Sequence, residues 1–471
     1  MPRTLLALTL TCLGPWCLGL SACRSDPMAP VRDAYWRGDY QSAWRQLQEV
    51  RDDYAGDRHL YDMEISVLAN AIADPTAAVE ALREARDRLD ELGGRGFFES
   101  FAAMMLDDRS LDYEGADYEH VLVRAMLALS DLMIDGKDAV AYSLQVLERQ
   151  QEIMDAFEDA SGKRPKHDYK LVAFGSYLRA IILDENPRDR AAAAREFRKV
   201  VEMEPGFRNG RADLERAERG WHCDKGNGVV HVLALVGRGP FRVEVWEKAS
   251  ADAIAIAQVI WNHNRHDGPM IINLNPIPIP ALAFHADNPD AVHVSVDGQD
   301  RGTTATITDV NEVASAEFRA IHDYVVARAV LRRMLKIVVV EATKEVVEHS
   351  GEDHYDKHGW WLLIDLFGLI WTGSERADLR CWSLLPQTFQ AARLEVPAGD
   401  HELVLRAGRN GHPTGAAQKV RVHVRDGYNT YVLVLAPTLR GGPPPLTSQP
   451  ADLPAQLPAD QHTPMTPAEV K

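Results

Sequence analysis

The spacing of apolar residues changes once along the chain. Over residues 31–220, apolar side chains recur at helical spacing among abundant Ala, Leu, Arg and Glu, which predicts short amphipathic helices almost throughout. From Trp221 onward, apolar runs such as 229–236 are separated by Gly-rich turns, which is typical of β-strands. We therefore expect an α+β chain, with an all-α domain at 31–220 and a mixed domain at 221–436.

Parts of the helical region resemble the tetratricopeptide repeat, a pair of stacked helices. Residues 38–43 resemble the turn and second-helix start of that repeat, and 118–132 with 140–157 form another apolar-periodic pair. The repeat's positions recur near the end of the region at Tyr177, Ala193, Phe197 and Pro205. Short amphipathic helices must stack on neighbours to bury a face, so a tetratricopeptide-like solenoid is predicted. A non-repetitive helical bundle is the alternative.

Short strands and one long helix are predicted for the second region. Asp297-Gly298 lies between the apolar runs 292–296 and 304–307, a hairpin pattern. A long helix is predicted from Val313 to about His349. Four more short strands predict a small antiparallel sandwich, at 391–396, 401–405, 419–424 and 430–435. Residues 437–471 are rich in Pro, Ala, Thr and Gln, which predicts a disordered tail.

Two features of the mixed region have more than one interpretation. Basic residues interrupt the apolar face of the long helix, at Arg328, Arg332, Arg333 and Lys336. A solvated helix face is favoured there, and a site for an anionic ligand or partner is the alternative. Segment 359–371 is Trp-rich, apolar and too short to span a bilayer. A buried core segment is favoured over a membrane-surface wedge or a partner contact.

The first residues have the pattern of a signal peptide. Arg3 precedes an apolar stretch at 5–20, which is too short for comfortable bilayer spanning. The stretch ends in Leu20-Ser21-Ala22-Cys23, which resembles the lipobox of bacterial lipoproteins. That resemblance implies a signal peptide at 1–22, an acylated Cys23 and a tether at 23–30. An ordinary secretory signal is the alternative. Arg24 in place of Asp implies, by resemblance to enterobacterial lipoproteins, the periplasmic face of the outer membrane.

Composition excludes some partners and leaves one question about cysteines. The net charge of -17 argues against nucleic acid as a partner, because phosphate binding requires a basic surface. Cys223 and Cys381 would be the two thiols left after processing, in an oxidising compartment. They either form a disulfide or stay as buried free thiols.

The glycine pairs at 226–228 and 237–239 do not continue into a dinucleotide fingerprint, and we expect no cofactor.

A polar loop rich in histidine is the candidate for catalysis. His349, His354 and His358 lie close in sequence to several carboxylates, and such groups can ligate a divalent metal. The helical HExxH pattern and the GxSxG pattern are both absent from the sequence, so polar composition alone is the favoured explanation. His263 and His266 carry a weaker signal. A metal-dependent periplasmic hydrolase using this loop is therefore the alternative function.

Three segments together are similar to a family of uncharacterised bacterial tetratricopeptide lipoproteins: 226–240, 328–336, and 377–386 followed by 397–399 and His401. The Ala-Asp-Leu-Arg-x-Trp-x-x-Leu-Pro run at 377–386 is the most specific of them. The resemblance covers most of the mature chain and implies architecture without an activity. We therefore expect a non-enzymatic envelope lipoprotein whose helical region offers a concave surface to a protein partner, while the β-containing region contacts a second component.

Overall fold

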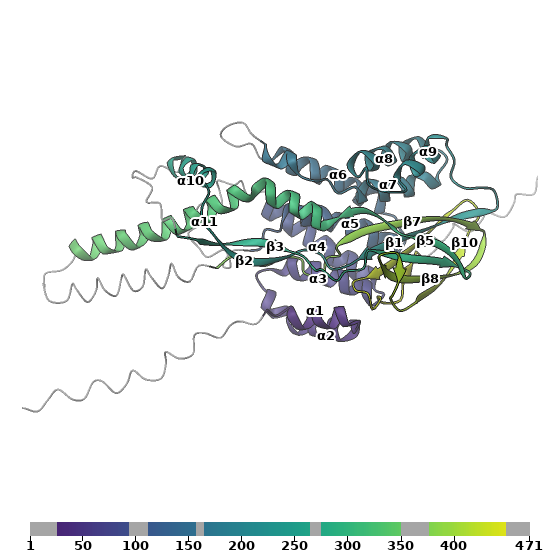
Figure 1. Cartoon of the computed structure of the whole chain (residues 1–471), viewed down its shortest axis with the longest axis horizontal. Coiled ribbons are helices and arrows are strands. Elements are labelled where there is room, and N and C mark those ends of the chain that lie inside the picture. Colours follow the sequence, from purple (N-terminus) through teal and green to yellow (C-terminus); the bar gives the residue numbers. More distant parts are fainter. Residues whose placement is uncertain (1–25, 94–111, 157–163, 264–274, 350–375, 449–471) are drawn as a thin grey trace, which may run out of the picture.

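Among the described residues, the first half of the chain is helical, as the apolar pattern predicts, and the strands lie in the second half together with two more helices. A computed structural model describes residues 26–93, 112–156, 164–263, 275–349 and 376–448, with side chains to Val259 in α10 and Met334 in α11 (Figure 1). The helices of the first half are α1 (Ala29–Arg37), α2 (Tyr40–Glu49), α3 (Arg58–Ala71), α4 (Pro75–Gly93), α5 (Asp117–Leu132), α6 (Ala139–Asp155), α7 (Phe174–Glu185), α8 (Arg190–Met203) and α9 (Gly210–Glu218), with 3-10 turns at Arg51–Tyr54 and Pro165–Asp168. Each helix packs mainly against its neighbours along the chain.

Local signals explain where two of the helix pairs turn. Gly38 ends α1 with a φ of 87°, a left-handed conformation that glycine adopts without strain. The Asp39 side chain then accepts the backbone N–H of Ser42 at 3.1 Å, which caps α2. In the pair α7–α8, the rings of Tyr177 and Phe197 meet edge to face with centroids 6.2 Å apart. The predicted helix pairs are confirmed at both places.

Helices α5 and α7 lie inside the molecule rather than on its surface. Every residue of α5 from Tyr118 to Leu132 is buried, which is typical of a helix covered on all sides. Phe174 at the start of α7 packs on Phe389 of the β-sheet, with ring centroids 4.9 Å apart. One hydrophobic cluster runs from the helices into Leu233 and Leu433 of the sheet. The chain's own sheet therefore covers this face of the helical layer.

The strands form two packed sheets and a separate ribbon. The first sheet has the order β12 (Leu446–Thr447), β11 (Asn429–Ala436), β1 (Asn227–Val236), β7 (Thr388–Pro397) and β6 (Ala305–Asp309). The second has the order β10 (Gln418–Val424), β8 (Gly399–Arg409), β4 (Ala291–Val296) and β5 (Gln299–Thr303), with β9 (His412–Pro413) beside β8. The ribbon pairs β2 (Phe241–Glu247) with β3 (Ile277–Ala283).

The first sheet is buried on both faces. In β1, Val232 and Ala234 face the second sheet, whereas Leu233 and Leu235 face the helices. Figure 1 shows β1 and β7 between α7–α9 on one side and β8 on the other. Burial on both faces explains why 229–236 is a continuous apolar run instead of an alternating one. The sandwich prediction is confirmed in this coarse form.

The expectation of purely antiparallel strands is wrong for one pair. β1 runs parallel to β11 and antiparallel to β7. A short hairpin forces neighbouring strands to be antiparallel, but β1 and β11 are separated by nearly the whole β-containing region, which permits a parallel pair. β2, the strand that follows β1 in the chain, pairs with β3 in the ribbon and not with β1.

The hairpin at Asp297-Gly298 is confirmed, but its second strand differs from the prediction. Both residues have positive φ angles, 51° and 77°, as a two-residue hairpin turn requires. The returning strand is β5, whereas residues 305–307 belong to β6 in the other sheet. β5 reads Gln-Asp-Arg-Gly-Thr and is almost fully exposed, so no apolar pattern marks it in the sequence.

The predicted disordered tail begins too early. Residues 437–448 are ordered, because β12 pairs with the edge strand β11 and Leu446 packs on the main cluster. The side-chain amide of Gln418 donates to the carbonyl oxygen of Pro443 at 2.6 Å. Gly442 passes so close to the Leu435 carbonyl that a Cβ there would overlap it. Pro and Gly at these positions therefore shape a docked edge segment.

The long helix belongs to an arm formed by β2, β3, α10 (Ala251–His263) and α11 (Val310–His349). Its prediction is confirmed, with the start at Val310 instead of Val313. The arm has its own small core, which joins Ala253 of α10, Ile279 of β3 and Leu331 of α11. In Figure 1 the arm runs outward from the body, with α10 and the ribbon beside α11. A cavity lies where the arm meets the helical layer.

Candidate functional site

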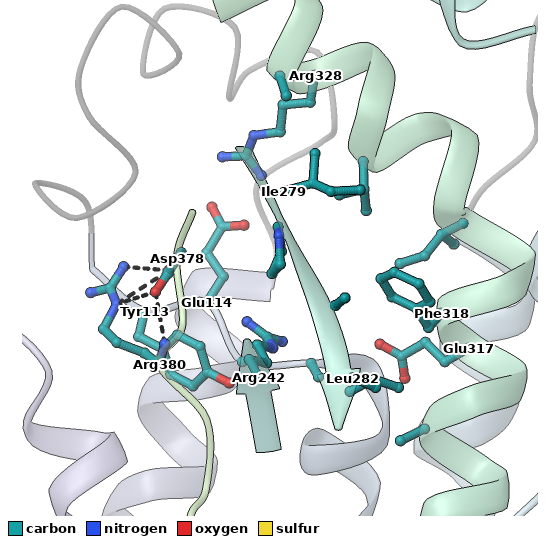
Figure 2. Close-up of a pocket in the computed structure, with 18 of the residues that line it drawn as sticks. Tyr113, Glu114, Arg242, Ile279, Leu282, Glu317, Phe318, Arg328, Asp378 and Arg380 are labelled. Atoms are coloured by element: carbon teal, nitrogen blue, oxygen red, sulfur yellow. Dashed lines mark hydrogen bonds and ion pairs between the residues drawn. The ribbon is translucent and has the colours of Figure 1, made fainter. Parts of the chain in front are cut away.

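The cavity at the base of the arm encloses about 230 Å³ (Figure 2). Its walls come from residues 112–116 before α5, from the β2–β3 ribbon and from α11. Asp378 and Arg380 complete it. These last two belong to the junction segment, residues 376–387, which leads from the arm back into β7. The cavity therefore forms only when the helical layer, the arm and the junction segment meet.

Buried carboxylates of the helical layer hold the junction segment. Glu119 of α5 accepts the backbone N–H of Trp382 at 2.8 Å. Glu64 of α3 accepts the N–H groups of Ser383 at 2.7 Å and Leu384 at 3.0 Å. Burial raises the pKa of Glu64 to about 7. This part of the junction segment is irregular, so the three backbone N–H groups have no partners within the segment. The two carboxylates accept hydrogen bonds from these N–H groups.

Arg380 fixes the start of the junction segment. Its guanidinium donates to the Asp57 carboxylate at 2.8 and 2.9 Å and to Asp378 at 2.8 Å. It also lies 5.5 Å from the ring centroid of Tyr113, whose backbone N–H donates to Asp57 at 2.8 Å. The run at 377–386 is thus a place where the two halves of the chain are joined.

Glu317 of α11 caps a helix from another part of the chain. Its carboxylate accepts the backbone N–H groups of Asp117 at 3.0 Å and Tyr118 at 2.8 Å, which are donors left unpaired at the start of α5. Burial, and after it the neighbouring Asp117 carboxylate, raises the pKa of Glu317 well above its usual range. Glu317 therefore holds the base of the arm against α5 and also lines the cavity.

Arg242 is the cation that the surrounding side chains leave available. Its guanidinium lies 5.8 Å from the ring centroid of Tyr113 and lines the cavity. Although burial alone lowers its pKa, Tyr113 and Glu119 raise the pKa above the usual range, so the group stays charged. Within the described ranges, this guanidinium makes no hydrogen bond and no ion pair. Figure 2 shows it between Tyr113 and strand β3.

The basic cluster of the long helix is not a solvated face. Arg332 and Arg333 are 4% and 7% exposed, and Arg333 donates to the carbonyl oxygens of Asn275 and Pro276 at 2.9 and 3.0 Å. Arg328 and Arg332 line the cavity. The favoured sequence interpretation is wrong for these residues, because the chain that enters β3 covers this side of α11. The side chain of Lys336 lies outside the described part.

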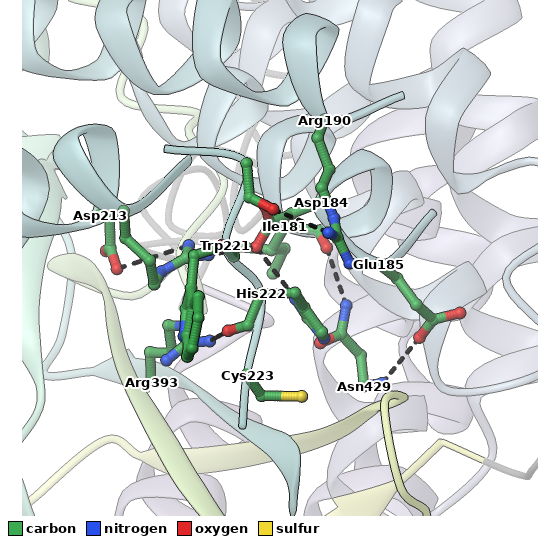
Figure 3. Close-up of polar contacts among 12 residues, drawn as sticks. Ile181, Asp184, Glu185, Arg190, Asp213, Trp221, His222, Cys223, Arg393 and Asn429 are labelled. Carbon is green, nitrogen blue, oxygen red and sulfur yellow. Dashed lines mark hydrogen bonds and ion pairs between the residues drawn. The ribbon is translucent and has the colours of Figure 1, made fainter. Parts of the chain in front are cut away.

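A second polar cluster joins the end of the helical layer to the sheet (Figure 3). Asp184 of α7 accepts Arg216 of α9 at 2.6 Å and meets Nδ1 of His222 at 3.1 Å. Arg393 of β7 donates to the His222 carbonyl oxygen. Although burial acts in the opposite direction, the His222 hydrogen bond and the Arg216 charge lower the pKa of Asp184. The side chains of Asp184 and His222 are 1% and 2% exposed, so the pair is a structural lock.

Cys223 and Cys381 are both free thiols, which is the second of the two alternatives left open by the sequence. The Cys223 thiol donates to the Asn227 carbonyl oxygen at one end of β1, whereas Cys381 lies in the junction segment near the other end. A ten-residue strand separates the two ends, roughly 30 Å at the rise of a β-strand. Burial raises the pKa of the Cys381 thiol to about 12.

Several predicted site residues lie outside the described part. These are Cys23, His266, His354, His358 and the apolar segment 359–371, together with the side chains of His263 and His349. Among the described side chains, no three His, Cys, Asp or Glu groups are arranged to hold a metal ion. Sequence analysis missed Arg242, Glu64, Glu119 and Glu317. For Glu119 there was a signal, an acidic residue in the first turn of an apolar helix.

Comparison with known proteins gives no match: no family model, no curated protein and no solved structure is similar to this chain. Within the described residues, no helix combines the length and apolar character needed to cross a membrane.

Proposed function

We propose that this protein is a membrane-anchored lipoprotein of the bacterial envelope that acts by binding, with the cavity beside Arg242 as its ligand site. An acylated Cys23 would hold it at the periplasmic face of the outer membrane. The helical layer would be a tetratricopeptide-like scaffold that also contacts an envelope protein. The signal-peptide pattern and the run at 377–386 support this lipoprotein assignment.

The state of the charged groups around the cavity carries the binding proposal. Glu317 is engaged by two backbone N–H groups, and Asp378 is engaged by Arg380. A general acid or base needs a titrating group that can reach the substrate, and both of these carboxylates already accept hydrogen bonds from the folded chain. The guanidinium of Arg242 has no hydrogen-bond partner within the described ranges, stays charged and does not transfer protons at neutral pH. That chemistry supports binding more than catalysis.

The location of α5 and α7 changes the proposed partner surface. The sheet packs on α7, and the junction segment and α11 contact α5, so the chain itself covers the face that would form the expected concave surface. A protein partner would therefore contact the outer helices α4, α6 and α8. Exposed residues such as Leu144 on α6 lie on that side.

A substitution that fills the cavity tests the proposed ligand site. Ala281 of β3 lines the cavity and Ala283 of the same strand does not. Deleting the native gene should cause an envelope defect. Expression of Ala281→Phe should leave that defect uncorrected, while expression of Ala283→Phe should correct it. Both variants should reach native levels and melt cooperatively. Full restoration by Ala281→Phe in a well-folded protein would refute the cavity as the functional site.

The anchor has a separate test. Cys23→Ala should move the protein from the membrane fraction to the soluble periplasm, because the acyl chains are attached to that thiol. The distribution is read by fractionation and immunoblotting after a carbonate wash. Retention of the variant in the washed membrane would contradict the lipid anchor.

A further inference from the structure

The cavity has a cationic end and an apolar wall, and we propose that its ligand is a small amphipathic anion, a carboxylate or phosphate monoester on a short apolar chain. This inference rests on the proposed function, since it names the ligand class of the same cavity. It uses the residues that line the cavity on three separate elements: β2, β3 and α11.

The cationic end is built around Arg242. Its guanidinium packs near the ring of Tyr113, which restricts the side chain, and it has no hydrogen-bond or ion-pair partner within the described ranges. A guanidinium presents its donors in a planar fork that matches the oxygens of a carboxylate or phosphate. An anionic head group would therefore supply the partner that the folded chain leaves out.

The acidic residues that line the cavity do not pair with the Arg242 guanidinium. Asp378 is bound to Arg380 at 2.8 Å, and Asp112 is bound to Arg88 at 2.5 Å. Glu317 is held by the start of α5. Three of the acidic side chains around the cavity therefore have structural partners of their own, and Glu114 lies on the Arg328 side in Figure 2.

Apolar side chains cover much of the rest of the lining. They are Ile279 and Leu282 from β3 and Phe318, Ile321 and Val325 from α11, although Glu317, Arg328 and Arg332 of α11 line the cavity as well. Figure 2 shows Phe318 and Leu282 on one side of strand β3, with Arg242 and Arg380 on the other. Burying each methylene group of a ligand against such a wall should tighten binding about fourfold. An ion without an apolar body would leave this wall unused.

The size of the cavity limits the ligand. At about 230 Å³, it is smaller than the range of roughly 300 to 1,000 Å³ that holds drug-sized molecules. A folded domain or a multi-chain lipid is therefore not the occupant of the cavity itself. A single short chain with one charged head fits both the volume and the separation of charge from apolar surface.

Calorimetric titration of the full chain tests the ligand class. The Cys23→Ala protein is titrated with octanoate and octyl phosphate, and with octyl glucoside, acetate and inorganic phosphate as controls, all below micelle-forming concentrations. The two amphipathic anions should bind one per chain, at least about tenfold more tightly than each control. Arg242→Gln should weaken their binding about 10- to 100-fold, and Arg242→Lys should restore part of it. The exposed Arg421→Gln should change nothing.

Each of the other results would overturn the proposal. If octyl glucoside binds equally well, the charge of the ligand does not contribute to binding. If acetate or phosphate binds equally well, the apolar wall does not contribute. No binding by any probe, or unchanged binding to Arg242→Gln, would remove the anion site. If these tests fail while Ala281→Phe still abolishes function in cells, the cavity is functional and only its ligand class is wrong. If the anions bind but Ala281→Phe functions normally, the proposed function fails instead.

Discussion

The backbone N–H of Trp382 donates a 2.8 Å hydrogen bond to the carboxylate of Glu119, a residue 263 positions earlier in the chain. The same carboxylate accepts the Tyr113 hydroxyl at 2.5 Å and the Ala116 N–H at 3.0 Å. One buried side chain thus joins α5, the loop before it and the junction segment. These are three of the parts that surround the cavity, so its shape depends on this contact.

Removing the charge of Glu119 should destabilise the whole fold. In Glu119→Gln, one carboxylate oxygen becomes an NH₂ group that faces a donor, which leaves a buried N–H or O–H unpaired. The free energy of unfolding should fall by about 1 to 3 kcal/mol. Urea denaturation followed by tryptophan fluorescence measures this change, with the exposed Glu148→Gln as the matched control. Equal stability of the two variants would mean that the contact is not needed.

The carboxyl group of Glu317 should make stability depend on pH. Burial raises its pKa in the folded state above the usual 4.5. Below that usual value both states hold the proton. As the pH rises, the unfolded chain loses the proton first, so the folded state loses stability until the pH passes the raised pKa. The side chain introduced by Glu317→Gln does not titrate, so the substitution changes the free energy of unfolding by an amount that does not depend on pH.

The stability of Glu317→Gln relative to wild type should therefore increase between about pH 5 and about pH 8, because the pKa of Glu317 is raised from 4.5 to about 8. Urea denaturation of both proteins across that range gives the difference directly. For Glu148→Gln the same difference should stay flat. A flat difference for Glu317→Gln would show that the folded state does not raise this pKa.

The buried polar cluster around Asp184 should contribute to the free energy of unfolding independently of Glu119. Asp184→Asn leaves Arg216 with the more distant Asp213, at 3.9 Å, as its anionic partner among the described residues, and losing the charged hydrogen bond should cost about 1.5 to 3 kcal/mol. Asp224→Asn, an exposed substitution close in sequence to His222, should cost almost nothing. Thermal unfolding of the two variants makes the comparison. If Asp184→Asn leaves the melting temperature unchanged, the cluster around Asp184 does not stabilise the fold.

The two cysteines should behave as free thiols of unequal reactivity. Denatured, unreduced protein should be alkylated at both Cys223 and Cys381, as read by mass spectrometry of their peptides. In the native protein Cys381 should react very slowly, because the thiolate is the reactive form and burial raises its pKa to about 12. Protection of both thiols until a reductant is added would instead establish the disulfide.

The order of the elements could be predicted because each has a periodic apolar pattern. The helix pair α5–α6 and the strands β7, β8, β10 and β11 fall where that pattern places them. β5 was missed because its exposed residues are polar. The ordered segment 437–448 was missed because Pro and Gly mark it as irregular, while its docking depends on the edge of a sheet formed elsewhere.

The candidate site could not be predicted from the sequence in the same way. Arg242, Glu317 and Arg380 belong to different elements, and they meet only through tertiary packing. The burial of Arg332 and Arg333 depends on the chain entering β3, which helical periodicity does not reveal. The run at 377–386 carried no predicted site residue other than Cys381, although the backbone N–H groups that bind Glu64 and Glu119 lie within it.

The most direct test of the account is a crystal structure of the Cys23→Ala protein grown with octyl phosphate. We expect density in the cavity, with the phosphate oxygens within hydrogen-bond distance of the Arg242 guanidinium and the alkyl chain against Phe318 and Ile321 of α11. An empty cavity at saturating ligand, a cavity filled by the chain's own residues, or a head group turned away from Arg242 would contradict it.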